Sequence, residues 1–316
     1  MKRVRSMYIW IVFFILLVVI TTYTFWDNNR VMVVEQEIKL NHLPEELNGF
    51  TILQITDLHE KQFGKWQSTL LKEINSQQYD AIVFTGDMLM ENDSTNFQPY
   101  FDIIDGLHNK EHALFVPGNS DPTPYKKYIR DNKVFYEKHA FYLEMENRGV
   151  KFLESLYSIK IGEHAIRFVD FEASLLTKNK QGEYVLEEFK DLENRREEDV
   201  LIALNHYPIV DDKVDYYKSH STFDFKNYDL VIAGHYHGGQ YRLPLIGAIF
   251  VPEAMYKWNG LFPPRDRVKG LWEYDGVKQY VSAGLGSSNT IPFMKFRLFN
   301  TPEINVLTIR RTTNGQ

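Results

Sequence analysis

The chain contains a series of short apolar runs, and most of them end directly in glycine or in polar residues. Runs of four to eight apolar residues bounded by such turn signals are typical of strands in a buried sheet. Strands are predicted at residues 31–40, 50–56, 80–87, 112–121, 165–171, 199–208, 229–237, 279–286 and 304–310. Helical spacing at 65–78 and a mixed helical region after 121 lie between them. Strands that alternate with helices predict an α/β architecture.

The residues that follow these strands are unusually rich in metal-binding side chains. In α/β sheets, ligands bind beyond the carboxyl ends of the strands, so all of these residues would reach one edge. They are Asp57 and His59, Asp87, Asn119 with Ser120 and Asp121, Asn205 with His206, and His235 with His237. Each one alone could be a turn residue or a surface histidine. Five such ends in succession favour a shared site.

The chemistry of this set predicts a metal centre. Asp57, Asp87, Asn119 and four histidines offer nitrogen and oxygen donors, which suit divalent transition ions. The sequence contains no cysteine, so thiolate sites and disulfides are excluded. The donors suffice for two ions, and Asp87 is the natural bridge because a carboxylate has two oxygens.

The pattern D-x-H, GD, GN, H and GHxH resembles that of the calcineurin-like metallophosphoesterases. The stretches AGHYHGGQYRLP (233–244) and SAGLGSS (282–288) resemble its membrane-associated bacterial branch. The likeness extends over roughly residues 46–310. It implies a four-layer α/β/β/α sandwich of two mixed sheets.

The same resemblance implies roles for individual residues. One metal would be held by Asp57, His59 and His237, and the other by Asn119, His206 and His235, with Asp87 between them. A hydroxide that bridges two Mn, Fe or Zn ions would attack phosphorus in line. The residues expected to act in catalysis are Asp87, Asn119, His206 and Ser120.

Ser120 departs from the family pattern, which commonly reads GNH followed by an acidic residue, whereas this chain reads GNSD. The usual histidine lies near the leaving group, and a serine hydroxyl is a much weaker acid. Loss of such a proton donor typically costs about 10²–10⁴-fold in rate. Three outcomes are open: a substrate with a good leaving group, a substitute donor such as His112 or Asp121, or a weakened enzyme.

The N-terminus predicts a membrane anchor. Residues 7–26 carry no charge, and a helix of this length is about 30 Å long, enough to span a bilayer. Trp10, Tyr23 and Trp26 lie near its ends. A cleaved signal peptide is the alternative, but no small-residue cleavage site follows the run. The basic segment MKRVRS predicts a cytoplasmic N-terminus and an extracytoplasmic catalytic domain in the cell membrane.

These features predict four parts: a cytoplasmic tail (1–6), a transmembrane signal anchor (7–26), a linker with the first strand (27–45) and the phosphoesterase domain (46–316). The expected substrate is a small or lipid-linked phosphoester, and the helix makes the membrane a partner. A net charge of −6 argues against a general nucleic-acid binder. The alternatives are a nuclease or cyclic-nucleotide phosphodiesterase, and a metal-binding envelope protein with weakened turnover. The sequence does not indicate the oligomeric state.

Some segments have simpler interpretations. Residues 185–198 predict a solvated helix. The aromatic, basic segment 253–270 predicts a partly packed surface loop, and a loop that lines the substrate mouth or touches lipid is the alternative. Five histidines lie away from the strand ends and receive no role: His42, His108, His139, His164 and His220.

Overall fold

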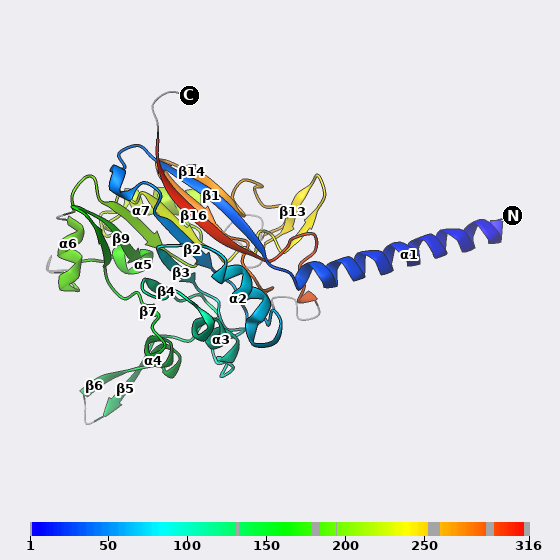
Figure 1. Cartoon of the computed structure of the whole chain (residues 1–316), viewed down its shortest axis with the longest axis horizontal. Coiled ribbons are helices and arrows are strands. Elements are labelled where there is room, and N and C mark those ends of the chain that lie inside the picture. Colours follow the sequence, from blue (N-terminus) through cyan, green and yellow to red (C-terminus); the bar gives the residue numbers. More distant parts are fainter. Residues whose placement is uncertain are drawn as a thin grey trace.

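Two β-sheets packed face to face form the centre of the protein (Figure 1). This is a computed structural model, and it describes residues 2–130, 133–178, 184–193, 195–251, 260–288 and 294–312. Each sheet has six strands among these residues. Both sheets mix parallel and antiparallel pairs, so the α/β fold expected from the sequence is confirmed.

The first sheet has the strand order β1-β16-β2-β3-β4-β7. Its strands are β1 (Met32–Leu40), β16 (Glu303–Arg311), β2 (Thr51–Ile55), β3 (Ala81–Thr85), β4 (Ala113–Val116) and β7 (Lys151–Phe152). The first and last long strands of the chain are neighbours, because β1 pairs with β16 in parallel. β2, β3 and β4 are mutually parallel, so their carboxyl ends meet at one edge.

The second sheet has the order β14-β15-β11-β10-β9-β8. Its strands are β14 (Gly270–Tyr274), β15 (Val277–Val281), β11 (Leu230–Ala233), β10 (Val200–Leu204), β9 (His164–Asp170) and β8 (Tyr157–Ile161). The four central strands are parallel, and only the pairs at the two edges are antiparallel. The carboxyl ends of β10 and β11 therefore also meet at one edge.

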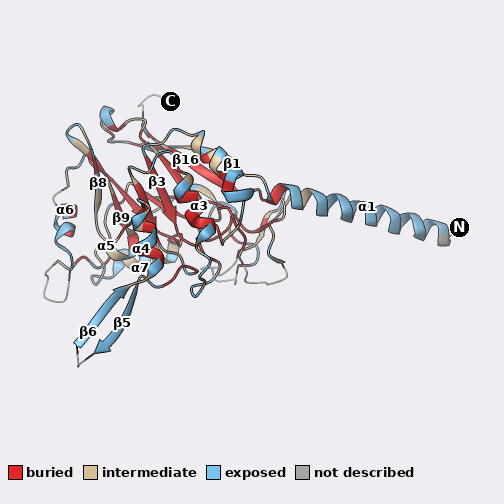
Figure 2. Ribbon diagram, turned by 60° about the horizontal axis from the view of Figure 1, so that its bottom comes forward, coloured by how far each residue is buried: buried red, intermediate tan, exposed pale blue. Residues whose placement is uncertain are grey.

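Helices cover the outer face of each sheet and complete four layers. In β3, Ala81 and Val83 face the second sheet, whereas Ile82 and Phe84 face the helices, so every position in this strand is buried (Figure 2). The first sheet is covered by α2 (Ser68–Asn75), α3 (Gln98–Gly106) and α4 (Ala140–Asn147). The second is covered by α5 (Phe171–Ser174), α6 (Lys190–Glu193) and α7 (Asp211–Ser219).

The N-terminal apolar segment forms one long helix, α1 (Lys2–Asn28), which projects from the domain (Figure 1). Its length and apolar composition are sufficient to cross a membrane, and a signal sequence would pass the same test. The helix ends against the domain, where Asp27 and Asn28 are buried.

Some elements differ from the sequence-based expectations. The region after residue 121 begins with a protruding, exposed hairpin, β5 (Tyr125–Arg130) and β6 (Lys133–Lys138), before the helix α4. A second hairpin, β12 (Tyr241–Leu243) and β13 (Gly247–Phe250), was not expected either. The helix predicted at 185–198 is two short pieces, a 3-10 turn (Glu187–Phe189) and α6, with Phe189 buried. Residues 253–259 of the predicted surface loop lie outside the described residues.

Candidate metal centre

The sequence-predicted residues meet where the parallel strands of both sheets end. Backbone hydrogen bonds join the loops: Asp57 N donates to Gly86 O (3.0 Å), His59 N donates to Asp87 O (3.0 Å), and Gly234 N donates to His206 O (3.0 Å). Asp57 also accepts a hydrogen bond from the backbone N of His235 (3.1 Å), which comes from the other sheet. Four separate segments are therefore joined at one site.

Two groups of three side chains place their ligand atoms close enough to hold a metal ion. Asp57, His59 and His237 form the first group, and Asp87, His206 and His235 form the second. Within each group the ligand atoms lie within 4.8 Å of one another, and all six residues are buried.

Asp87 connects the two groups. Its Oδ2 lies 3.5 Å from His59 Nε2 in the first group and 3.3 Å from His206 Nε2 in the second. His206 Nε2 lies 3.1 Å from His235 Nδ1. One carboxylate oxygen is thus adjacent to both groups.

The turn after β4 carries the remaining expected residues. Ser120 is buried beside Asp87, because its backbone N donates to Asp87 Oδ1 (2.8 Å). Asn119 precedes it on the exposed rim of the same turn. Gly118 admits this close approach, since a Cβ there would lie 2.2 Å from Asp87 Oδ1.

The two suggested substitutes for the absent histidine do not fit that role. The carboxylate of Asp121 accepts hydrogen bonds from the backbone N of Asp87 (2.7 Å), Met88 (3.0 Å), Leu89 (3.2 Å) and Gly118 (2.8 Å), so it fixes two turns together. His112 precedes β4, at the opposite end of the strand from Ser120, and its Nδ1 lies 2.9 Å from the Tyr157 hydroxyl. Neither side chain is presented as a proton donor to the site.

The backbone at this site is strained. A positive φ is uncommon for residues other than glycine and costs free energy unless the surrounding structure enforces it. Asp57 (53°), His59 (47°), Asp87 (57°), His235 (70°) and His237 (48°) all have it. Strained backbone gathered at one constellation is typical of a functional site.

Buried nitrogens at this site fit a metal. Among the described residues, both ring nitrogens of His59 and Nδ1 of His237 are buried without a hydrogen-bond partner. Such unpaired polar atoms are costly in a protein interior, and coordination to a cation would satisfy them. The donor set, imidazole with carboxylate, suits Mn, Fe or Zn.

The charges of the site are strongly coupled. Burial alone would raise the pKa of Asp87, but the neighbouring His206 charge holds that pKa below its ordinary value. Burial opposes the charged form of His206, yet the Asp87 carboxylate outweighs it and raises the pKa of His206 to about 10. Burial, and then the charge of His59, lower the pKa of His237, so this ring is neutral and able to coordinate. A metal ion would displace the proton held between Asp87 and His206.

Several supporting residues were not identified from the sequence. Thr85 O lies 2.8 Å from His206 Nδ1 and thereby directs Nε2 toward Asp87. The Thr56 hydroxyl donates to Asp57 Oδ2 (2.9 Å). The fully buried Arg297 donates to the carbonyl of His237 (3.3 Å) and to that of Gly286 (2.9 Å). Thr56 and Thr85 adjoin the motif residues, whereas Arg297 has no local signal.

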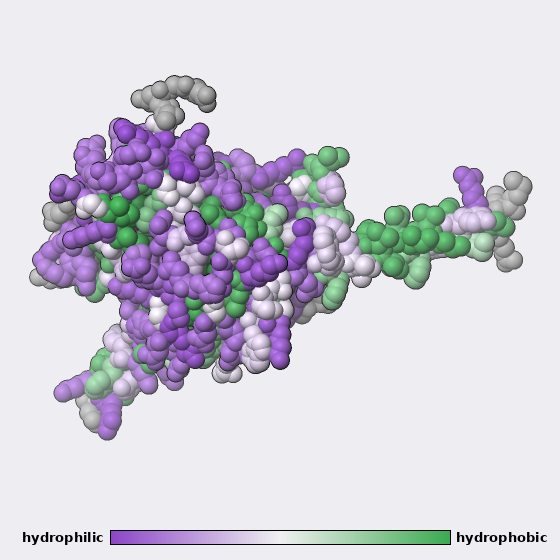
Figure 3. All heavy atoms as spheres, in the orientation of Figure 1, coloured by the Kyte–Doolittle hydropathy of each residue, from purple (hydrophilic) through white to green (hydrophobic). Residues whose placement is uncertain are grey.

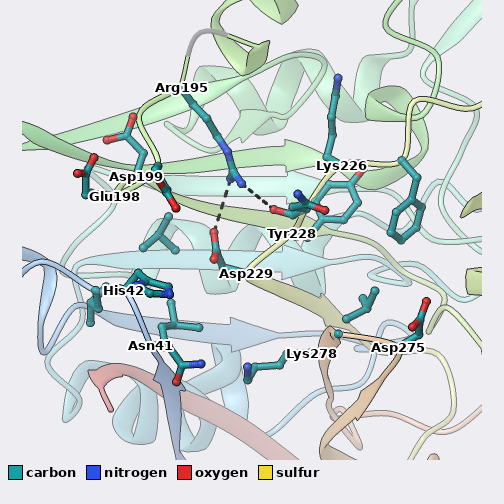
Figure 4. A pocket seen from close by; sticks show the side chains of 18 of the residues that line it. Asn41, His42, Arg195, Glu198, Asp199, Lys226, Tyr228, Asp229, Asp275 and Lys278 are labelled. Atoms are coloured by element: carbon teal, nitrogen blue, oxygen red, sulfur yellow. Dashed lines mark hydrogen bonds and ion pairs between the residues drawn. The ribbon is translucent and has the colours of Figure 1, made fainter. Parts of the chain in front are cut away.

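A separate cavity of about 380 Å³ opens at the other edge of the second sheet, where β10 and β11 begin (Figure 4). It is lined by charged side chains that pair with one another. Arg195 lies 3.6 Å from Asp229, and Lys218 lies 2.7 Å from Asp275. His42 lines this cavity and is thus remote from the metal-binding groups.

Comparison with known proteins agrees with this geometry. The profile of the calcineurin-like phosphoesterase family matches residues 50–239, which contain both metal-binding groups and more than half of the chain. The chain therefore belongs to the calcineurin-like phosphoesterases, hydrolases that act on phosphoesters. It is 24% identical over 297 residues to the uncharacterized metallophosphoesterase YkuE of Bacillus subtilis (strain 168), covering 90% of this chain and 88% of that protein.

A solved structure that is similar in part is the phosphopantetheinyl hydrolase PptH of Mycobacterium tuberculosis. The similarity covers 76% of this chain and 91% of that one, at 14% identity and a TM-score of 0.37.

Proposed function

We propose that the protein is a dinuclear metallophosphoesterase that acts at the outer surface of the cell membrane. Asp57, His59 and His237 bind one ion, and Asn119, His206 and His235 bind the other. The observation that carries this proposal is the position of Asp87 Oδ2, 3.5 Å from His59 and 3.3 Å from His206. A carboxylate oxygen shared by two buried histidine groups is suited to bridging two cations.

The bound ions would supply Lewis-acid activation of water and of the phosphoryl oxygens. Hydrolysis forms a bond from the water oxygen to phosphorus, breaks the ester P–O bond and leaves the departing alkoxide to gain one proton. Asp121 and Ser120 hold the Asp87 turn in place through their hydrogen bonds. Thr85 fixes the ring of His206. These contacts preorganise the site before substrate arrives.

Because position 120 lacks the usual histidine, the range of esters that the site can cleave efficiently is limited by the stability of the leaving group. A serine hydroxyl donates a hydrogen bond but is a poor acid at neutral pH, so the natural ester should have a stable leaving group. Ser120 is buried next to Asp87, which its backbone N contacts.

The helix α1 is proposed to be a permanent anchor rather than a cleaved signal. Asn28 Nδ2 donates to Arg297 O (2.7 Å), and Arg297 N donates to Asn28 Oδ1 (2.8 Å). The buried Asp27 accepts from the Thr301 hydroxyl (2.8 Å) and pairs with Arg30 (2.7 Å). Cleavage would remove contacts that tie the helix to the segment holding His237. The basic N-terminus then places the domain outside the cytoplasm.

Metal analysis and turnover in matched variants test this proposal. Two aspartates flank β3: Asp87 at the site and Asp80, exposed, at the other end. Purified wild type should contain two transition ions per chain and hydrolyse bis(4-nitrophenyl) phosphate. We expect Asp87→Asn to lose metal and turnover together and Asp80→Asn to keep both. Equal metal content in the two variants, or turnover in Asp87→Asn, would contradict the proposal.

A further inference from the structure

A cavity of about 840 Å³ lies between the end of α1 and the candidate metal centre. His59, a member of the first metal-binding group, lines one end of it. Leu17 and Ile20, farther toward the N-terminus of α1, line it as well, and the domain contributes Met90 and Phe296. The cavity is therefore continuous from the membrane segment to the reacting centre.

The helix presents one face to this cavity. The residues of α1 that line it recur at the three- and four-residue spacing that places side chains on one side of a helix. They are Leu17, Ile20, Thr21, Thr24, Phe25 and Asn28. Leu17 precedes Asn28 by about 16 Å of helix, so in a spanning helix this face extends into the outer half of the hydrocarbon layer. Figure 3 shows that the surface of α1 is strongly hydrophobic along its middle and paler where the helix meets the domain.

The helix and the domain are held together at the cavity floor. The reciprocal hydrogen bonds between Asn28 and Arg297 fix the end of the helix. Lys61, two residues after His59 in the chain, donates a hydrogen bond from its Nζ to Asn28 O. The rings of Tyr23 and Phe299 lie 5.5 Å apart. This wall of the cavity is therefore positioned by specific contacts, and a flexible tether would not produce it.

The two ends of the cavity differ in chemistry. The cavity is also lined by Lys61 and the exposed Lys295, and both amino groups can donate hydrogen bonds to a phosphate. Glu60 lines the cavity too, but its carboxylate accepts hydrogen bonds from Met90 N (3.0 Å), the Ser94 hydroxyl and Asn96 Nδ2 (2.9 Å). The end at Leu17 and Ile20 is lined by the aliphatic side chains of these two residues. An occupant with a phosphate at one end and a long alkyl chain at the other complements both ends.

We propose that the anchor helix forms one wall of the substrate site, and that the substrate is a phosphoester with a long hydrocarbon chain. The chain lies along the Leu17–Phe25 face of α1, and the phosphate reaches His59 beside Lys61 and Lys295. The substrate then enters sideways from the outer leaflet without leaving the membrane. This inference rests on the proposed phosphoesterase function and specifies its substrate class.

The test uses the full-length protein in phosphatidylcholine nanodiscs with two chromogenic diesters. Hexadecyl 4-nitrophenyl phosphate and ethyl 4-nitrophenyl phosphate share the reacting group and differ only in chain length. Because the hexadecyl chain partitions into the bilayer beside the cavity and the ethyl group does not, we expect wild type to prefer the hexadecyl ester by at least about tenfold in kcat/KM.

Two neighbouring threonines of α1 provide matched variants. Thr21 lines the cavity, whereas Thr22 points elsewhere on the same helix. Thr21→Trp fills the cavity and should lower the ratio of hexadecyl to ethyl turnover by at least about fivefold. Thr22→Trp adds the same indole to the membrane segment and should leave that ratio unchanged. A diazirine-tagged hexadecyl phosphate should label residues 20–25 and Phe296, and excess hexadecyl phosphate should suppress this labelling.

The outcomes separate the two proposals. Metal-dependent hydrolysis of both esters with equal ratios in the two tryptophan variants would overturn the lipid groove but keep the phosphoesterase. Labelling spread evenly around α1 and unaffected by competitor would also overturn the groove. Failure of wild type to hydrolyse the ethyl ester, with no metal bound, would overturn the phosphoesterase itself.

Discussion

In the second sheet, polar and charged side chains gather at both the amino ends and the carboxyl ends of the central strands, but their interactions differ between these two edges. At the amino ends of β10 and β11, charged groups such as Arg195 and Asp229 pair with each other around a cavity (Figure 4). At the carboxyl ends, His237 follows β11 and meets His59 from the loop after β2 of the first sheet. Both rings are buried on backbone with positive φ, and both ring nitrogens of His59 and Nδ1 of His237 have no hydrogen-bond partner. The charged groups at the first edge form ion pairs with their own neighbours, whereas the second edge gathers imidazole and carboxylate groups that a cation would satisfy. Buried imidazoles gathered on strained backbone, rather than charged residues alone, distinguish the candidate metal-binding edge.

Removing one histidine from each edge should give the largest contrast. We expect His206→Ala to lose metal and to lower turnover roughly 10³-fold or more, because the ions supply several kcal/mol of transition-state stabilisation. His42→Ala, at the paired edge, should retain both properties. Metal analysis and bis(4-nitrophenyl) phosphate kinetics measure the difference. Equal losses of metal and turnover in the two variants would contradict the proposed difference between the edges.

Loss of a carboxylate acceptor should also differ between the edges. Asp121 accepts four backbone N–H groups that fix the Asp87 turn, and Asp229 accepts one from Leu201 N (2.8 Å). In Asp121→Asn, the side-chain NH₂ group would replace one acceptor oxygen and would lie against backbone N–H groups, which are also donors. We expect Asp121→Asn to lower turnover roughly 10–100-fold through displaced ligands, and Asp229→Asn to affect only stability. Unchanged kinetics in Asp121→Asn would show that the Asp87 turn keeps its position without the Asp121 carboxylate.

A smaller effect is expected where the site departs from its family. Ser120→His would supply an acid near the leaving group, so turnover of alkyl phosphomonoesters should rise roughly tenfold or more. Metal content should not change, because Ser120 contacts Asp87 through its backbone. Steady-state kinetics with alkyl and 4-nitrophenyl phosphates would reveal the gain on the alkyl ester. Identical kinetics on both would place position 120 away from the leaving group.

The smallest effect concerns stability at the same edge. Asp170 ends β9 and caps α5 by accepting from Ala173 N (2.8 Å), and burial raises its pKa from 3.8 to about 7. Between about pH 4 and about pH 7 the folded protein keeps the Asp170 proton, whereas the unfolded chain releases it. The free energy of unfolding therefore falls as the pH rises through this range. Asparagine is neutral and an equally good cap. We expect Asp170→Asn to gain roughly 1–3 kcal/mol in free energy of unfolding at pH 8 and little at pH 4. Urea unfolding at both pH values measures this, and a gain independent of pH would contradict it.

The α/β class predicted from the sequence is confirmed, and the polar residues expected at strand ends do follow strands. This succeeded because a buried strand has a local signature and parallel strands deliver their ends to one edge. Asp57, Asp87, His206 and His235 all follow such strands. The hairpin β5–β6 was missed because its exposed strands bury no face that would produce alternation.

Contacts between distant segments could not be read from the sequence. Arg297 meets Asn28 across most of the chain, and no local pattern around either residue indicates this. The cavity beside α1 depends on that contact, so it was not expected. Asp121 was suggested as an acid because its type fits, but only the structure shows its oxygens occupied by backbone donors. The residue types at a strand end can be predicted from the sequence, whereas the distant residues that contact them often cannot.

The most direct test of the central claim is anomalous X-ray scattering from crystals of the wild-type protein grown with manganese. The account predicts two peaks about 3.5–4 Å apart, one on each side of Asp87 Oδ2, with His59 and His237 at one peak and His206 and His235 at the other. A single peak, or peaks remote from Asp87, would contradict it.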